Sequence, residues 1–355
     1  MSVEGFRRLV ISSRALQTHD GKRLHEMFGT AGLEVALVAE DEQSRLPASL
    51  DKRRSTLSVF YAPSAGWITK AEHGSLAVRR NEYYLHPVIG CVMGCTYCYL
   101  QALPTKRLPV RLFVGIASLL ADVRALLGST PLVEGPLLFC TGELADSLRD
   151  ASLYPIASVL VQFFATQDCG RLELRTKSST VESLLQVPHN GRTTVAFSLA
   201  PHPAMMRFEP GTASVQQRLL AAELCRQAGY PIAFKFEPLF LYSGWEAEYD
   251  VLLKQAATLI GLANLDHVSI GCLRWGEQLG ELPLFQRDYE AELQRGVPIQ
   301  YRARRRNFTL PRSERLMAYQ TFRTMLLRHG FSGPIAWSLE EPSVIEVLAT
   351  TIGTS

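Results

Sequence analysis

Apolar and polar positions alternate in a regular rhythm along the middle of the chain. From Tyr83 to Cys272, apolar runs of strand length are separated by longer amphipathic runs of helix length. The strand-length runs include PLLFC, RLELRT, TTVAFSL, PIAFKFEP and LDHVSIGC, and the helix-length runs include LYPIASVLVQFFA, VQQRLLAAELCRQAG and YDVLLKQAATLI. Such alternation predicts βα units whose strands form a parallel sheet. About six units fit, which indicates an α/β fold with an open or partial (β/α) barrel and functional groups at the C-terminal ends of its strands.

The two ends of the chain depart from this rhythm. Residues 1–80 are poorly periodic and include a charged stretch at 40–54 that is typical of a loop or linker, so we expect an N-terminal extension that packs on the main domain. We expect residues 81–280 to form the barrel and residues 281–355 to cover one of its mouths. That last segment has a helical pattern over SERLMAYQTFRTMLLRHG, and IAWSLEEPSVIEVLA predicts a strand or turn followed by a short helix.

Composition narrows the class of protein. Apolar residues make up 47% and charged residues 20% of the chain, which is typical of a globular domain. Apolar runs are too short for a membrane span. The N-terminus, MSVEGFRRLV, lacks an apolar stretch followed by a small-residue cleavage site, so we expect a cytoplasmic protein.

Seven cysteines are present, and three of them fall within eight residues. An odd number with this clustering argues against a disulfide framework. In a reducing compartment, such a group is more often a metal site or a catalytic site. The cysteines are Cys91, Cys95, Cys98, Cys140, Cys169, Cys225 and Cys272.

The clustered cysteines, in HPVIGCVMGCTYCYLQ, have the spacing C-x3-C-x2-C. Three thiolates can hold three irons of a [4Fe–4S] cluster and leave the fourth iron without a protein ligand. An open iron can bind a substrate or cofactor directly. A zinc site would need a fourth Cys or His, and His86, five residues before Cys91, keeps zinc open as an alternative.

The C-x3-C-x2-C loop is the signature of the radical S-adenosylmethionine (SAM) superfamily, and within it the chain resembles the spore photoproduct lyase family. The resemblance covers residues 83–260 and includes CTYCYLQ, Cys140-Thr141, Thr176-Lys177, Phe197-Ser198, RFEPGT, QQRLLAAELCRQAGYPIAF and GWEAEYDVLL. It implies a partial (β/α)6 TIM-like barrel of the radical SAM type. It also implies reductive cleavage of SAM to a 5′-deoxyadenosyl radical, which abstracts hydrogen from a thymine dimer in DNA before a carbon–carbon bond is cleaved. The cluster ligands would be Cys91, Cys95 and Cys98.

The resemblance also implies catalytic residues. Cys140 matches the cysteine that returns a hydrogen atom to the product radical, although the end of PLLFC also suits an ordinary core cysteine. Tyr97 and Tyr99 match tyrosines of a radical relay. Because alternate residues of an extended chain face opposite ways, we expect one of them to pack structurally, and Tyr99 is the better catalytic candidate.

Four residues are implied as SAM contacts. Lys177, at the end of RLELRT, matches the contact to the SAM carboxylate, although a lysine there can also be merely solvated. Ser198 would hydrogen-bond the methionyl part, and Tyr97 lies beside the cluster loop. Glu143, in CTGE, resembles the glycine–glutamate element that holds the SAM ammonium in many radical SAM enzymes. In the spore photoproduct lyase family, a different pair of residues occupies the positions of Gly142 and Glu143.

The C-terminal third departs from the lyase pattern. The stretch YRARRRNFTLPR places Tyr301 beside Arg304 and Arg305, a mixture that suits phosphate contact and base stacking. Arginine also pairs with the phosphate or carboxylate of a small metabolite, and such a stretch can be only a solvated basic face.

Three functions stay open at this point. The first is a DNA-repair lyase that binds damaged DNA and takes electrons from an external one-electron reductant of the flavodoxin or ferredoxin type. The second is a family member doing other radical chemistry on a nucleoside, a sugar or an amino-acid-derived small molecule, which predicts SAM cleavage without DNA affinity. The third is a nucleic-acid-binding protein with a purely structural cluster, which predicts no SAM cleavage.

Overall fold

The computed structural model describes most of the chain. The predicted loop at 40–54 lies outside the described residues, as do Tyr301, Arg304 and Arg305. In the part that is described, no helix has both the length and the apolar character needed to cross a membrane. The described residues are 3, 5–39, 55–62, 66–71, 81–103, 110–129, 136–299 and 307–350.

The largest sheet is a half-barrel of eight strands in the order β16-β12-β11-β10-β9-β8-β5-β4. Neighbours from β16 to β5 are parallel, and only β4 pairs antiparallel, with β5. The strands β5 and β8–β12 are the six expected from the apolar rhythm, so the prediction of a partial (β/α)6 barrel is confirmed. The bounds are β4 Ile68–Lys70, β5 Glu82–Leu85, β8 Leu137–Thr141, β9 Gly170–Thr176, β10 Thr193–Ser198, β11 Ile232–Leu239, β12 Leu265–Cys272 and β16 Ile335–Trp337.

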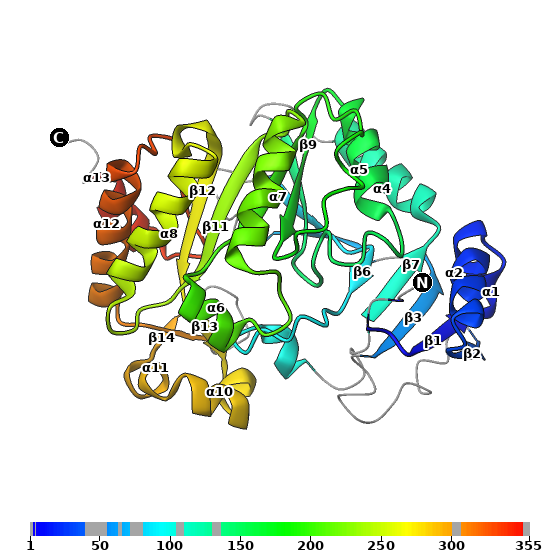
Figure 1. Cartoon of the computed structure of the whole chain (residues 1–355), viewed down its shortest axis with the longest axis horizontal. Helices are drawn as coiled ribbons and strands as arrows, with labels where there is room; N and C mark the ends of the chain where they lie inside the picture. The colour runs from blue at the N-terminus through cyan, green and yellow to red at the C-terminus, as the bar shows by residue number, and fades with distance from the viewer. Residues whose placement is uncertain are drawn as a thin grey trace.

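Helices cover the outer face of this sheet (Figure 1). The start of α7 shows how the sequence sets a helix boundary, because Ser214 and Gln217 form a capping box there. Gly229, with φ of 90°, follows the end of the same helix. The bounds are α4 Ile116–Ser129, α5 Ile156–Ala165, α6 His202–Phe208, α7 Val215–Gln227, α8 Trp245–Leu259, α12 Arg312–Arg328 and α13 Pro342–Thr350.

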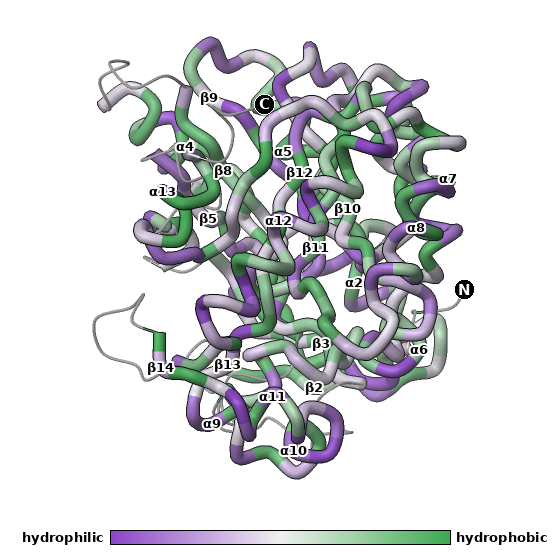
Figure 2. The backbone as a smooth tube through the Cα atoms, turned by 90° about the vertical axis from the view of Figure 1, so that its left-hand side faces the viewer, coloured by the Kyte–Doolittle hydropathy of each residue, from purple (hydrophilic) through white to green (hydrophobic). Residues whose placement is uncertain are grey.

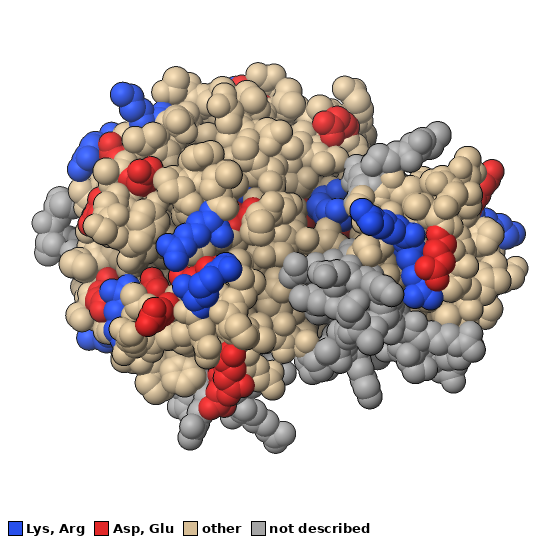
Figure 3. Space-filling view, turned by 60° about the horizontal axis from the view of Figure 1, so that its bottom comes forward, with Lys and Arg blue, Asp and Glu red and all other residues tan. Residues whose placement is uncertain are grey.

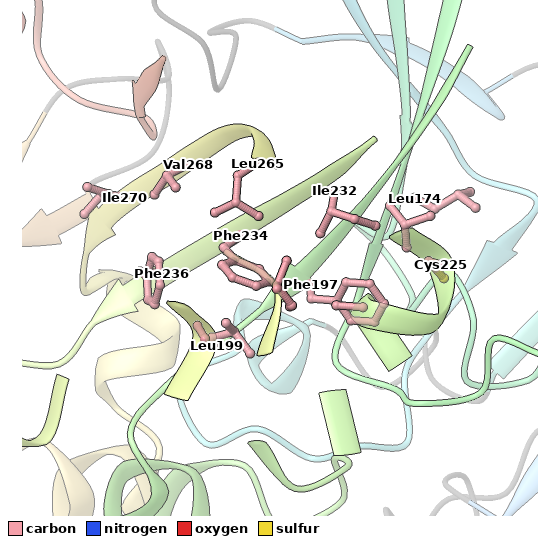
Figure 4. Close-up of a cluster of buried hydrophobic side chains, with 14 of the residues drawn as sticks. Leu174, Phe197, Leu199, Cys225, Ile232, Phe234, Phe236, Leu265, Val268 and Ile270 are labelled. Atoms are coloured by element: carbon pink, nitrogen blue, oxygen red, sulfur yellow. The ribbon is translucent and has the colours of Figure 1, made fainter. Parts of the chain in front are cut away.

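The main core lies between the sheet and these helices. Figure 4 shows part of it, with Phe197, Phe234 and Phe236 among the buried side chains. Each such aromatic or aliphatic side chain contributes about 1.5–3 kcal/mol when removed from water. The other face of the strands points into the barrel, and there β9 and β11 carry charged residues at alternate positions.

The N-terminal residues form a second sheet, in the order β2-β1-β3-β7-β6. It has its own apolar core, which includes Leu9, Ile11 and Phe28. Because β6 leads directly into the three-cysteine loop, this sheet holds one end of that loop. The bounds are β1 Arg8–Ser12, α1 Ser13–Leu16, α2 His19–Thr30, β2 Glu34–Val38, β3 Thr56–Tyr61, β6 Val88–Ile89 and β7 Val110–Val114.

The segment that directly follows β12 lies at the C-terminal ends of the barrel strands. A small antiparallel sheet, β13-β15-β14, lies there with three short helices, visible at the lower edge of Figure 2. Trp275 and Phe285 anchor these elements in an apolar cluster that includes Phe208 of α6. The bounds are β13 Arg274–Gly276, α9 Glu277–Gly280, α10 Pro283–Asp288, α11 Glu290–Arg295, β14 Val297–Ile299 and β15 Asn307–Thr309, with short 3₁₀ helices at η2 Tyr99–Ala102 and η5 Leu262–Asn264.

Candidate active site

The three-cysteine loop connects β6 to η2 and is held by backbone contacts. The amide of Thr96 donates to the carbonyl of Phe208 at 2.9 Å, and the amide of Gly211 donates to the carbonyl of Met93 at 3.0 Å. A Cβ atom at Gly211 would lie 2.5 Å from that carbonyl oxygen, so only glycine permits this approach. Phe208 and Gly211 both belong to the RFEPGT segment, so this segment holds the three-cysteine loop in place.

The three cysteines of the loop are free thiols, of which Cys95 is buried and Cys91 and Cys98 are half-buried. Burial raises the pKa of Cys95 to about 12, and it raises those of Cys91 and Cys98 as well. The Lys177 ammonium opposes this shift at Cys95 and Cys98. Buried thiols of this kind ionise when a cationic group binds them, and thiolates are the donors that iron–sulfur clusters use. The donor set therefore fits a [4Fe–4S] cluster. Across the described ranges, no three His, Cys, Asp or Glu side chains converge on a point where a single metal ion could bind, whereas a cubane cluster binds each thiolate to a different iron.

A cavity of about 650 Å³ opens beside this loop. Its volume falls within the range of about 300–1,000 Å³ that is typical of small-molecule sites. Residues at or beyond the C-terminal ends of β8–β12 line one side, and Trp275 and Leu279 of the C-terminal segment line another. The cavity therefore lies where a parallel barrel gathers functional groups.

All four residues predicted to contact SAM line this cavity: Tyr97, Glu143, Lys177 and Ser198. Ser198 is the last residue of β10, and Lys177 directly follows β9. Glu143 lies after β8, where Gly142 adopts φ of 94°. The structure therefore brings these side chains together, although their roles stay predictions.

Tyr97 and Lys177 belong to a buried polar group under the cluster loop. The Tyr97 hydroxyl donates to a Glu209 carboxylate oxygen at 2.5 Å, and the other oxygen of that carboxylate accepts from Arg218 at 2.7 Å. The Lys177 ammonium lies 4.0 Å from Glu209 and 5.8 Å from the centre of the Tyr97 ring. These contacts fix Tyr97 and leave the ammonium at the cavity wall.

Tyr99 differs from Tyr97 in its surroundings. It is 39% exposed, and its hydroxyl donates to the backbone carbonyl of Glu143 at 3.2 Å. Tyr97 instead packs edge-on against Phe240. Tyr97 is therefore packed against its neighbours, whereas Tyr99 is accessible from the cavity.

Cys140 lies beneath the floor of the cavity. It is fully buried in β8, opposite Tyr84 of β5 and Glu173 of β9 in the strand register. Arg175 donates from Nη2 to its Sγ atom at 3.0 Å, and the thiol donates to Glu82 at 3.5 Å. Tyr84 and Arg175 line the cavity above it. Burial raises the pKa of Cys140 well above its ordinary value, so the S–H bond stays intact.

The sequence reasoning missed a set of charged side chains inside the barrel. The pairs Arg175–Glu173 and Lys235–Glu237 have N···O distances of 2.5 and 3.1 Å. The missed signal is the alternation in RLELRT and IAFKFEP, where a charge at every second position faces away from the leucines and phenylalanines of the core. The set comprises Glu82, Glu173, Arg175, Lys235, Glu237 and His267.

The candidate substrate residues Tyr301, Arg304 and Arg305 lie outside the described residues, so their role stays a prediction. The chain on either side of them is described. Strands β14 and β15 pair antiparallel with Ile299 opposite Asn307, and Asn307 lines the cavity. On the face shown in Figure 3, basic and acidic side chains lie side by side among the described residues.

Comparison with known proteins agrees with this arrangement. A family model described as "Spore photoproduct lyase" matches residues 7–273. The spore photoproduct lyase of Geobacillus sp. (strain Y412MC61) is 28% identical over 250 residues, covering 67% of this chain and 69% of the relative. That of Bacillus subtilis (strain 168) is 27% identical over 249 residues, covering 69% and 71%.

Solved structures show the same fold. A spore photoproduct lyase complexed with dinucleoside spore photoproduct matches with a TM-score of 0.83 and 22% identity, covering 94% of this chain and 99% of that one. A mutant of a spore photoproduct lyase with bound AdoMet (SAM) and dinucleoside spore photoproduct also matches with a TM-score of 0.83, at 21% identity. Because the family model covers most of the chain, from β1 to the end of β12, this protein belongs to the spore photoproduct lyase family.

Proposed function

We propose that this protein is a radical SAM enzyme that repairs a thymine dimer of the spore-photoproduct type in DNA. The observation that supports this most is the placing of two kinds of thiol around one cavity. Of the three free thiols in the cluster loop, that of Cys98 lines the cavity, and the protonated thiol of Cys140 contacts Arg175, which lines it too. The curated relatives are named for the same reaction.

In this proposal, Cys91, Cys95 and Cys98 hold a [4Fe–4S] cluster. When bound, the cluster and SAM supply the one-electron cleavage that generates a 5′-deoxyadenosyl radical for hydrogen abstraction. An external reductant of the flavodoxin or ferredoxin type would deliver the electron.

The SAM contacts follow from charge and position. The Lys177 ammonium, held at the cavity wall near Glu209, would bind the SAM carboxylate through charge-assisted hydrogen bonds. The Glu143 carboxylate would accept from the SAM ammonium, and the Ser198 hydroxyl would hydrogen-bond the methionyl part. Tyr97, fixed by Glu209, would pack beside the cofactor.

Cys140 would complete the repair by giving the hydrogen atom of its S–H bond to the thymine radical left after carbon–carbon cleavage. This step needs a protonated thiol, and burial provides one. Tyr99, exposed on the cavity wall, and Tyr97 are the candidates for giving a hydrogen atom to the Cys140 thiyl radical, and the tyrosyl radical left behind would take one electron from the external reductant and a proton from solvent. DNA would contact Tyr301, Arg304 and Arg305, which follow β14 in the sequence.

One experiment tests the function. The protein is reconstituted anaerobically with iron and sulfide, then given SAM and dithionite with irradiated spore-type DNA, undamaged DNA or no DNA. The proposal predicts 5′-deoxyadenosine in every case and restored thymine only from the irradiated DNA. Formation of 5′-deoxyadenosine with neither repair nor DNA binding would contradict it and favour radical chemistry on a small molecule.

A further inference from the structure

Two oppositely charged side chains from one strand face the inside of the barrel. Lys235 and Glu237 alternate in β11 with Phe234 and Phe236, which are buried in the main core. The alternation directs Lys235 and Glu237 to the opposite face of the sheet, and both line the cavity. In the strand register Lys235 lies beside Ser198, the candidate SAM contact.

The Lys235 ammonium has unused hydrogen-bonding capacity. The side chain is only 4% exposed, and among the described residues only the Glu237 carboxylate lies close enough to Nζ to accept from it. The Glu237 carboxylate lies 3.1 Å from Nζ and neutralises its charge, while one of its oxygens accepts from the Ser269 hydroxyl. An ammonium carries three donors, and burying donors without acceptors is costly. The arrangement therefore suits a ligand that brings an acceptor to Lys235.

The pair also offers an acceptor beside this donor. The Glu237 side chain is 25% exposed. Burial alone would raise its pKa, but the adjacent Lys235 ammonium keeps the pKa below its ordinary value, so the group is a carboxylate. A donor next to an acceptor is complementary to a carbonyl next to an N–H group. The imide edge of a thymine ring presents this pattern, with O4 as acceptor and N3–H as donor.

We propose that Lys235 and Glu237 form the subsite that binds the imide edge of one thymine ring of the substrate. This inference rests on the proposed function and extends it to a substrate contact. The ammonium would donate to a ring carbonyl, and the carboxylate would accept from N3–H. The neighbouring position of Ser198 would hold this ring next to SAM.

The test compares two ligands and two kinds of variant. The ligands are the dinucleoside spore photoproduct and its derivative methylated at N3 of both rings, which cannot donate from the imide. The variant is K235M/E237M, because replacing a buried ion pair by apolar residues of similar volume is often neutral for folding. The matched control is K254M/E246Q, which removes two exposed charges on α8. Affinities are measured with SAM-loaded, reconstituted protein, and folding is checked by thermal unfolding.

The wild type and the control should bind the dinucleoside photoproduct at least about tenfold more tightly than the methylated derivative, which is the worth of one charge-assisted hydrogen bond. K235M/E237M should bind both ligands equally weakly while still forming 5′-deoxyadenosine. A folded double variant that keeps the wild-type discrimination would overturn this inference and leave the proposed function standing. Failure of the wild type to bind or repair the photoproduct would instead refute the proposed function, and the inference with it.

Discussion

The guanidinium of Arg175 donates a hydrogen bond to the sulfur of Cys140, with 3.0 Å between Nη2 and Sγ, in the closed interior of the barrel. The same guanidinium pairs with Glu82 at 2.7 Å and with Glu173 at 2.5 Å. Two carboxylates therefore offset the positive charge that would otherwise favour a thiolate. The result is an oriented thiol that keeps its proton, which is the form that a hydrogen-atom donor requires.

Removing this guanidinium should destabilise the fold. In R175M, the carboxylates of Glu82 and Glu173 lose their shared cation in a buried environment, so we expect the free energy of unfolding to fall by about 3–5 kcal/mol. Urea unfolding followed by circular dichroism measures this change. R226M is the matched control, because Arg226 pairs with Glu223 on the exposed side of α7 and should matter little. If R175M and R226M lowered the free energy of unfolding by the same amount, the buried charges around Arg175 would not stabilise the fold as proposed.

Substitution of Cys140 should separate SAM cleavage from repair. We expect C140A to form 5′-deoxyadenosine at a near wild-type rate, because Cys140 does not touch the cluster loop in the proposed scheme. Restoration of thymine should drop by about a hundredfold or more, taking the loss of a positioned proton donor as the guide to the loss of a positioned hydrogen-atom donor. Product analysis by liquid chromatography gives both values.

The control for Cys140 is another buried cysteine. Cys225 of α7 is fully buried in the main core, away from the barrel interior. C225A should keep repair and lose only some stability. If C140A repairs DNA as well as C225A does, Cys140 is a core residue, which is the alternative that its sequence position left open.

Lys177 should govern the affinity for SAM. K177M removes the ammonium at the cavity wall, so we expect the dissociation constant for SAM to rise about tenfold through loss of a charge-assisted contact. Equilibrium dialysis with reconstituted protein measures it. K254M, which removes an exposed lysine of α8, serves as the control. Unchanged SAM affinity in K177M would assign Lys177 to solvent instead.

His86 predicts a pH dependence of stability. Burial lowers its pKa from the ordinary value of 6.5 to about 4, and Nε2 is 2.9 Å from the Thr69 hydroxyl. As the pH falls below 6.5, the unfolded chain takes up a proton that the folded protein resists, so the stability from neutral His86 is lost between about pH 6.5 and 4. The stability difference between wild type and H86Q should therefore be smaller at about pH 5 than at about pH 7.5. Urea unfolding at both pH values checks this, and an unchanged difference would show that folding does not shift the pKa of His86.

The barrel was predictable because its strands are apolar on the side that meets the helices, and the intervening helices have their own periodicity. The N-terminal sheet was not, because β1, RLVIS, is a short apolar run, and two other strands of this sheet, β6 and β7, lie after residue 80. When two strands are far apart in the sequence, the sequence around each strand does not show that they pair.

The residues of the site also fall into those that the sequence predicted and those that it did not. Cysteine spacing and family resemblance located the loop and the residues that line the cavity. The interior charges were missed because Glu173 and Arg175 lie within an apolar strand, and only the curling of the sheet places them beside His267 and Glu82 of other strands. These two pairings depend on which strands are close to one another in the folded sheet, and the sequence of a single strand does not reveal that.

The proposed radical chemistry depends on Cys91, Cys95 and Cys98 holding an iron–sulfur cluster with one iron open to SAM. Electron paramagnetic resonance of the reconstituted, dithionite-reduced protein, recorded with and without SAM, detects such a cluster. We expect a [4Fe–4S]⁺ signal whose g-values shift when SAM is added, and no such signal in C98A. A signal that SAM leaves unchanged, or protein that binds zinc and no iron, would contradict it.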